Sequence, residues 1–254
     1  MLDMLFYVEN ISLPIPEIKK FTIFPQQFTP DLCGTVEMID GRRIYTTDKG
    51  DKYPSITTIL SNTMELDKKN ILENWKERIG EDEANQIKEN AADRGTILHD
   101  LIQKYIMGEE YLEGLSKTTN LNKRLFEQFK KEIDKHLTDV RMIEKSLYCD
   151  SLKVCGRVDI IGCWDGKLSI IDLKTSTRSK SISEVGDYFL QETAYAICYA
   201  EHFGEKIEGI TTLIATENSL KAKVINDTPQ KHLTNLIKRV RLYHEENNNE
   251  KENI

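Results

Sequence analysis

Two aspartates and a lysine lie within a short stretch of otherwise mostly apolar residues, and together they could do metal chemistry. They are Asp159, Asp172 and Lys174. Carboxylate oxygens suit hard divalent cations, and a lysine beside such a cation is a common companion in sites that handle phosphate. A carboxylate and an ammonium are costly to bury unless they are paired or bind a charged group. The three residues alone leave two interpretations open: an ion pair at the end of a strand, or a metal site.

The segment that carries these residues is predicted to form a β-hairpin. Asp165-Gly166 separates two apolar, β-rich runs, which is the strongest short-range signal for a tight turn between strands. Side chains alternate along a strand, so Asp172 and Lys174 share one side and Leu173 faces the other. How closely Asp159 approaches Asp172 depends on twist and bulges, which the sequence does not give.

Further polar side chains with chemical potential lie on predicted helices and in a loop. His99 lies at the edge of the apolar stripe of a helix predicted over 81–107, where a histidine is usually a satisfied core residue. Gln191 and Tyr195 are four residues apart, on one face of a later predicted helix. The basic, hydroxyl-rich loop at 174–180 is of a kind that contacts phosphates, although such loops are often only loops.

The remaining sequence predicts helices and strands on both sides of the hairpin. Residues 67–79 carry an apolar stripe at helical spacing that includes Trp75, which we interpret as a core residue rather than a platform for stacked bases. Residues 1–53 are broken by prolines and predict short strands and loops. The order of elements predicts an α/β fold in which a mixed sheet is flanked by helices. The other predicted elements are helices over 121–140, 188–203 and 229–244, and strands over 142–149, 210–215 and 221–225.

The composition favours a globular protein without a membrane segment. No apolar run approaches the roughly 18 residues of a membrane span, and the acidic Asp3 and Glu9 argue against a leader peptide. The formal net charge of −7 argues against a basic coat for nonspecific nucleic-acid binding, but it leaves room for a local basic groove. We expect a cytoplasmic protein with a disordered tail over 245–254.

The cysteines of the chain form no C-x-x-C pair. We therefore expect reduced, buried thiols rather than a disulfide framework, a zinc site or an iron–sulfur site. The five residues are Cys33, Cys149, Cys155, Cys163 and Cys198.

Four motifs, each weak alone, occur in an order that resembles a known family. They are His99, G-R-V-D at 156–159, D-L-K-T at 172–175 and Q-x-x-x-Y at 191–195. On their predicted helix–strand–strand–helix elements they resemble the RecB-like branch of the PD-(D/E)XK nucleases, over about residues 54–215. Within that branch, Y-P-S-I-T at 53–57 and R-G-T-x-x-H at 94–99 resemble the mitochondrial genome maintenance exonucleases and similar phage-encoded exonucleases.

The resemblance implies a domain organisation and a metal. It implies a restriction-endonuclease-like PD-(D/E)XK core over 54–244 with a helical arch at about 55–107, and leaves 1–53 as an accessory lobe. Mg²⁺ suits the implied oxygen ligands, and a histidine ligand also suits Mn²⁺. The iron–sulfur cysteines of some relatives are missing, so no cluster is expected. The implied metal ligands are His99, Asp159, Asp172 and the backbone carbonyl of Leu173.

The resemblance also implies roles for the other polar residues. Lys174 would orient the attacking water or stabilise charge on the phosphate in the transition state. Gln191 and Tyr195 would position the substrate backbone or the lysine. The residues implied to clamp flanking phosphates are Arg94, Thr175, Ser176 and Arg178.

The function expected from this resemblance is that of a metal-dependent DNA exonuclease. It would hydrolyse phosphodiester bonds from free single-stranded ends in replication, recombination or repair, as a monomer that meets replication or recombination proteins on DNA. One alternative is a structure-selective endonuclease or a double-strand recombination exonuclease with the same active site. Another is a DNA-binding module without catalysis, which is disfavoured because neither the acids nor the lysine is missing.

Overall fold

The centre of the computed structural model, which describes residues 21–23 and 31–252, is a six-stranded mixed sheet. β1 is parallel to β5 and β7 is parallel to β8, whereas the other neighbours are antiparallel. The mixed α/β sheet predicted from the sequence is confirmed. Its strands, in spatial order, are β1 (Thr22–Ile23), β5 (Leu137–Cys149), β6 (Val154–Trp164), β7 (Lys167–Ser176), β8 (Gly209–Thr216) and β9 (Lys223–Asp227).

The predicted hairpin forms the middle of this sheet as β6 and β7. Asp165 and Gly166 both have positive φ, 49° and 79°, as a two-residue hairpin turn that matches strand twist requires. The ladder runs from Trp164 opposite Lys167 to Ile160 opposite Ile171, and pairing stops there. The two strands therefore separate at the end that carries the predicted catalytic residues.

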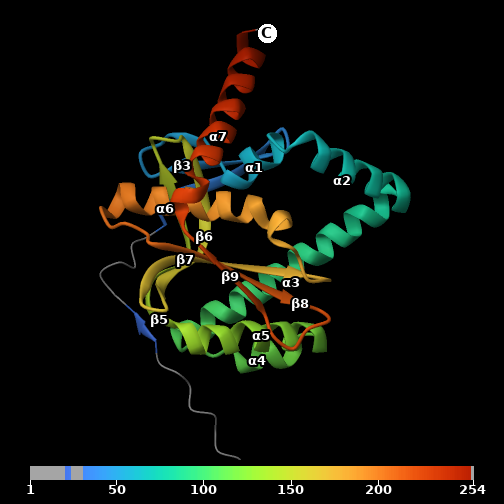
Figure 1. Ribbon diagram of the computed structural model, residues 1–254, viewed down its shortest axis with the longest axis vertical. Helices are drawn as coiled ribbons and strands as arrows, with labels where there is room; N and C mark the ends of the chain where they lie inside the picture. Colours follow the sequence, from blue (N-terminus) through green and yellow to red (C-terminus); the bar gives the residue numbers. More distant parts are fainter. Residues whose placement is uncertain (1–20, 24–30, 253–254) are drawn as a thin grey trace, which may run out of the picture.

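Helices cover both faces of the sheet and give it two hydrophobic cores (Figure 1). One face packs against α1 (Ile56–Asn62), α6 (Gly186–Phe203) and α7 (Pro229–Glu252). The other packs against α3 (Glu81–Met107) and α5 (Asn120–His136), with the short α4 (Leu112–Lys117) beside them. The turn η2 (Ile182–Val185) leads into α6, which makes the crossover between the parallel strands β7 and β8.

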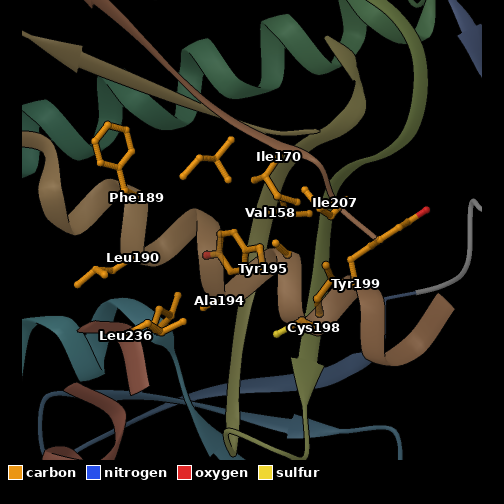
Figure 2. Packing of buried hydrophobic residues seen from close by; sticks show 14 of the residues in the cluster. Val158, Ile170, Phe189, Leu190, Ala194, Tyr195, Cys198, Tyr199, Ile207 and Leu236 are labelled. Carbon is orange, nitrogen blue, oxygen red and sulfur yellow. The ribbon is translucent and has the colours of Figure 1, made fainter. Parts of the chain in front are cut away.

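The first of these cores is organised by α6. Figure 2 shows Phe189, Ala194 and Tyr195 of this helix among Val158 and Ile170 of the sheet. Most residues of α6 are buried, so the helix presents polar groups to the interior as well as apolar ones. Any polar side chain on its inner face must therefore find a partner or a ligand.

A separate three-stranded antiparallel sheet lies within the predicted accessory lobe. It is formed by β2 (Cys33–Ile39), β3 (Arg42–Thr47) and β4 (Lys52–Pro54). The lobe is not wholly separate, because β1 belongs to the main sheet. Residues 1–20 and 24–30 of this predicted lobe lie outside the described residues.

A disulfide joins the small sheet to the main one and corrects the prediction for the cysteines. Cys33 of β2 and Cys155 of β6 are bonded, whereas Cys149, Cys163 and Cys198 are free. The two bonded residues are 122 positions apart in sequence, so no local spacing signalled the pair.

The helix α2 (Leu66–Ile79) departs from its predicted role. With α3 it forms a V that extends beyond the sheet (Figure 1). None of its residues is buried, so the interpretation of Trp75 as a core residue is wrong. Ile71 is 69% exposed, although helical spacing of apolar residues usually marks a core-facing stripe.

Two further element boundaries differ from the prediction. The helix predicted to reach residue 140 ends at His136, because Leu137 already pairs with Trp164 as the first residue of β5. The predicted disordered tail is helical up to Glu252, since no glycine or proline interrupts α7 after its first residue. Among the described helices, none combines the length and apolar character needed to cross a membrane.

Candidate active site

The pair Asp172 and Lys174 lies on β7 just beyond the point where β6 and β7 separate. As predicted, both side chains share one side of the strand and Leu173 packs into the opposite core; in the structure their side is the one that α6 covers. The lysine Nζ donates to Asp172 Oδ1 at 2.6 Å. Asp172 is only 1% exposed, and burial raises the pKa of its carboxyl to about 6 despite the neighbouring ammonium. Burial lowers the pKa of Lys174, but the charges of Asp172 and Asp159 outweigh it and raise the value above normal.

Asp159 takes over the hydrogen bonding of the sheet where the ladder ends. Its Oδ2 accepts from the backbone N–H of Leu173 at 2.7 Å, which satisfies a donor that β6 no longer pairs. Its other oxygen lies 3.5 Å from Nδ1 of His99. Asp159 therefore links the hairpin to α3, and its charge raises the pKa of both Asp172 and Lys174.

His99 is held between two carboxylates and a carbonyl. Its Nδ1 is 2.9 Å from Glu144 Oε1 on β5, and its Nε2 is 3.2 Å from the carbonyl oxygen of Leu173. Burial lowers the pKa of the imidazole, but Asp159 and Glu144 raise it by more, to about 9. A cationic imidazole thus sits where the structure gathers oxygen atoms.

The donor set around His99 fits a divalent cation. One atom each from His99, Glu144 and Asp159 lie within 4.8 Å of one another, which is a spacing that one ion can bridge. The Leu173 carbonyl adds an oxygen to this set. Asp172, a predicted ligand, lies outside the group, and both of its carboxylate oxygens lie 2.6 Å from the Lys174 Nζ.

Gln191 and Tyr195 lie on the inner face of α6, close to the same acids. Gln191 Nε2 donates to the Tyr195 hydroxyl at 3.2 Å. Burial raises the pKa of Tyr195 well above its usual value, and Asp159 and Asp172 add to this effect. The ring packs directly on Gly156, where a Cβ would approach within 2.7 Å. A glycine at 156 therefore leaves the room that the Tyr195 ring needs where α6 packs on β6.

The predicted phosphate-binding residues are only partly gathered. Arg94 Nε donates to Thr175 Oγ1 at 3.3 Å, and its Nη1 pairs with Glu217 at 3.1 Å. Ser176 is buried, and its hydroxyl accepts from the N–H of Arg178 at 3.4 Å. The Arg178 guanidinium binds Glu184 within its own loop, so it is not joined to the other three.

A model of a protein family matches the part of the chain that contains this site. The model described as "PD-(D/E)XK nuclease superfamily" matches residues 74–250, which include all the acids named above and the lysine. The chain belongs to the PD-(D/E)XK nuclease superfamily. In this nuclease the separated strands and the acid–lysine pair therefore occupy the matched region, and the accessory sheet lies outside it.

Two curated relatives carry the same protein description. The nuclease is 31% identical over 147 residues to the mitochondrial genome maintenance exonuclease 1 of Homo sapiens, covering 56% of this chain and 42% of that protein. It is 28% identical over 165 residues to the protein of the same name from Mus musculus, covering 62% of this chain and 48% of the relative. The match thus spans less than half of each relative.

A solved structure, provisionally named an exonuclease, from Eubacterium rectale superposes weakly on this chain. The TM-score is 0.38 at 15% identity, over 61% of this chain and 68% of that one.

Sequence reasoning missed three residues of the site. Glu144 stands alone on a strand, so no spacing marked it, although its positive φ of 50° sets it apart within β5. Glu192, next to Gln191, is fully buried, and one of its carboxylate oxygens accepts from Thr212 while the other has no partner. The ring of Tyr188 lies 5.3 Å from Lys174 Nζ, one helical turn before Gln191.

Proposed function

We propose that this protein is a metal-dependent DNA exonuclease that hydrolyses phosphodiester bonds from free single-stranded ends. The observation that carries the proposal is the meeting of the Asp172–Lys174 pair with the His99, Glu144 and Asp159 cluster where β6 and β7 separate. Membership of a nuclease superfamily and likeness to proteins named as exonucleases support it. Replication, recombination or repair of DNA is the setting we propose.

The metal centre would be held by residues from three elements. His99 of α3, Glu144 of β5 and Asp159 of β6 would bind Mg²⁺ or Mn²⁺, with the Leu173 carbonyl and Asp172 completing the oxygen ligands. When bound, such an ion neutralises phosphate charge and makes a water molecule more acidic.

The chain's own groups would supply positioning and charge. Lys174 keeps its proton because two carboxylates surround it, so it offers a fixed cation to a phosphate oxygen as negative charge develops there. The Gln191 amide and the Tyr195 hydroxyl hold each other on α6 beside these acids and limit how the substrate backbone can lie. Arg94 and Thr175 would contact a neighbouring phosphate.

The requirement for a free end is supported by the shape of α2 and α3. These helices form a V that stands away from the sheet (Figure 1), and His99 lies in the C-terminal half of α3. The apolar side chains of α2 remain exposed, including Ile71 and Leu66. We propose that this V confines a DNA strand on its way to His99, so that the strand enters by its end.

A direct test compares linear and covalently closed circular single-stranded DNA in Mg²⁺. We expect the linear substrate to be degraded and the circle to survive, with the Lys174→Ala variant inactive on both. Equal cleavage of the two would reject the end requirement and favour the endonuclease alternative. End-labelled single- and double-stranded substrates in the same assay measure strand preference and the direction of digestion.

A further inference from the structure

The cleft beside the cluster of His99, Glu144 and Asp159 has a wall that lies outside the matched nuclease region. This cleft, of about 520 Å³, is lined by His99, Glu144 and Asp159, and also by Arg157 of β6 and Arg43 of β3. Arg43 belongs to the small three-stranded sheet, for which the sequence suggested no role. The cleft is thus shared between the nuclease core and the accessory sheet.

The backbone of Arg43 is anchored on both sides by the segment that leads into α1. Its N–H donates to Thr58 Oγ1 at 3.1 Å, and its carbonyl accepts from the N–H of Ser55 at 2.8 Å. Ser55 also forms a β-bridge with Cys155, two residues before Arg157. Ser55 therefore joins the two strands that carry the arginines, so the separation of Arg43 and Arg157 does not depend on a flexible loop.

The two guanidinium groups have free hydrogen-bonding capacity. Arg157 Nε forms an ion pair with Glu144 Oε2 at 2.9 Å, while Glu144 Oε1 faces His99, so this arginine is attached to the cluster of His99, Glu144 and Asp159. Its two terminal nitrogens make no hydrogen bond or ion pair within residues 21–23 and 31–252, and its side chain is 56% exposed. Over the same residues the Arg43 side chain makes none at all.

Arginine nitrogens that keep free donors beside an acidic cluster are informative in a chain whose net charge is −7. Once a divalent ion has neutralised the acids, the remaining charge in the cleft is positive. A guanidinium presents paired donors that match the oxygens of a phosphodiester. A nearby open space continues the cleft along α3, since nothing lies within 4 Å of where a Cβ of Gly95 would be.

We propose that Arg43 and Arg157 form a phosphate-binding pair that holds the DNA backbone next to the bond that is cut. This contact is separate from the Arg94–Thr175 pair and rests on the proposed function. It makes the small sheet part of the substrate-binding surface. Binding would neutralise one phosphate at each arginine, while Arg157 also orients Glu144 toward His99.

The salt dependence of DNA binding tests the proposal. A labelled single-stranded oligonucleotide is titrated with the protein in Mg²⁺ between 50 and 200 mM salt, with Lys174→Ala in every variant to prevent cleavage. Each phosphate contact on a single strand contributes about 0.7 to the slope of log affinity against log salt. We expect Arg43→Ala and Arg157→Ala each to lower that slope by about this amount and to weaken binding about tenfold at low salt.

Conservative and neighbouring substitutions separate charge from structure. Arg43→Lys keeps the charge and should retain the slope while losing part of the affinity. Arg42→Ala is the matched control, because Arg42 precedes Arg43 on the same strand but binds Asn247 of α7 and lines another hollow. Its slope should equal that of the protein with only Lys174→Ala. In the protein that retains Lys174, Arg43→Ala should raise KM by a larger factor than it lowers kcat.

The outcomes distinguish this proposal from the proposed function. Slopes for Arg43→Ala and Arg157→Ala that match the Arg42→Ala control would overturn the phosphate-binding pair, even in a protein that cleaves DNA normally. The thermal midpoint of each variant is measured as a control, and an unaltered value shows that a change in DNA binding does not come from misfolding. Failure of the proposed function would instead appear as absence of Mg²⁺-dependent cleavage by the unsubstituted protein, which is a separate measurement.

Discussion

Lys174 is the residue whose state depends most on its neighbours. A buried lysine would ordinarily lose its proton more readily, but the carboxylates of Asp172 and Asp159 reverse this effect and keep it cationic. Asp172 in turn is held in place by that ammonium at 2.6 Å. Among residues 21–23 and 31–252, Asp172 is the acid that accepts a hydrogen bond from Lys174, so a substitution of either residue removes this pair.

Lys174→Ala and Asp172→Ala are expected to lower kcat by about 10³-fold or more, because each removes a charge placed at the reacting phosphate or its metal. DNA binding should be largely retained in both. Lys221→Ala, which changes an exposed lysine in the β8–β9 loop, serves as the control. Substantial cleavage by either site variant would show that the catalytic roles are assigned wrongly.

The buried carboxyl of Glu192 should make the stability of the protein depend on pH. Burial raises the pKa of its carboxyl well above normal, and Asp172 adds to the effect. A carboxyl with a raised folded-state pKa favours the folded state below its unfolded pKa, and that contribution is lost as pH rises through the folded value. We compare the thermal midpoints of Glu192→Gln and the unsubstituted protein in metal-free buffer. The midpoint of the variant minus that of the unsubstituted protein should become more positive as the pH rises from 6 to 9.

The matched control for this pH series is Glu113→Gln. Glu113 is exposed and pairs only with Lys117 on α4, so its difference from the unsubstituted protein should stay constant over the same range. Parallel curves for Glu192→Gln and Glu113→Gln would mean that Glu192 is already ionised in the folded protein.

At the scale of elements, the interface between α6 and β6 depends on a glycine. Gly156→Ala would push a Cβ to within 2.7 Å of the Tyr195 ring and should cost about 1–3 kcal/mol in free energy of unfolding. Gly95→Ala offers the opposite case, since its Cβ would meet nothing within 4 Å and the substitution should stabilise α3 by about 0.5–1 kcal/mol. Urea unfolding of both variants measures the two signs, and equal effects would contradict the packing described for Tyr195.

The two tryptophans test whether α2 lies outside the core. Trp164→Ala should cost about 3–5 kcal/mol, because Trp164 is 3% exposed in the core beneath α5. Trp75→Ala should cost less than about 1 kcal/mol, because no residue of α2 is buried. Denaturant titration of both variants gives the comparison. A large loss of stability at Trp75 would show that α2 packs more closely than the structure describes.

Sequence patterns predicted the elements whose structure is determined by neighbouring residues. The turn at Asp165-Gly166 and the bounds of α3 follow from turn chemistry and from helical periodicity, which neighbouring residues carry by themselves. The start of β5 was missed because Leu137 fits a helical stripe equally well, and only its pairing with Trp164 decides the outcome. Trp75 was misplaced because periodicity shows that a stripe exists but not what covers it.

The candidate site was predictable as far as its residues formed motifs. His99, Asp159 and the Asp172–Lys174 pair lie close together in the structure, and their catalytic roles stay predictions. Glu144 and Arg43 were not foreseen, because each stands alone in its segment and reaches the site only through pairing of distant strands.

At the scale of the whole molecule, the proposed metal centre makes an ion and a proton compete for His99. The imidazole has a pKa of about 9 without metal, so near neutral pH an ion must displace its proton. Apparent Mn²⁺ affinity should therefore rise with pH up to about 9, by at most about tenfold per pH unit for one proton released. Calorimetric titration between pH 6.5 and pH 9 checks this trend.

A His99→Gln variant provides the comparison for the metal titration. It should bind Mn²⁺ more weakly at high pH and show a shallower dependence on pH, because the proton that competes is gone. Removing the ion with a chelator should abolish cleavage in the unsubstituted protein and restore it when Mn²⁺ or Mg²⁺ is returned. An affinity independent of pH would place the ion away from His99.

The two faces of the central sheet each give the active site one side: α3 brings His99 from one, and Asp172 with Lys174 points toward α6 on the other. A partly unfolded form that kept only one layer of helices would lack part of the candidate site. Enzymatic turnover should thus vanish at the first step of denaturation, whichever layer detaches first, and the loss of activity reports the integrity of both.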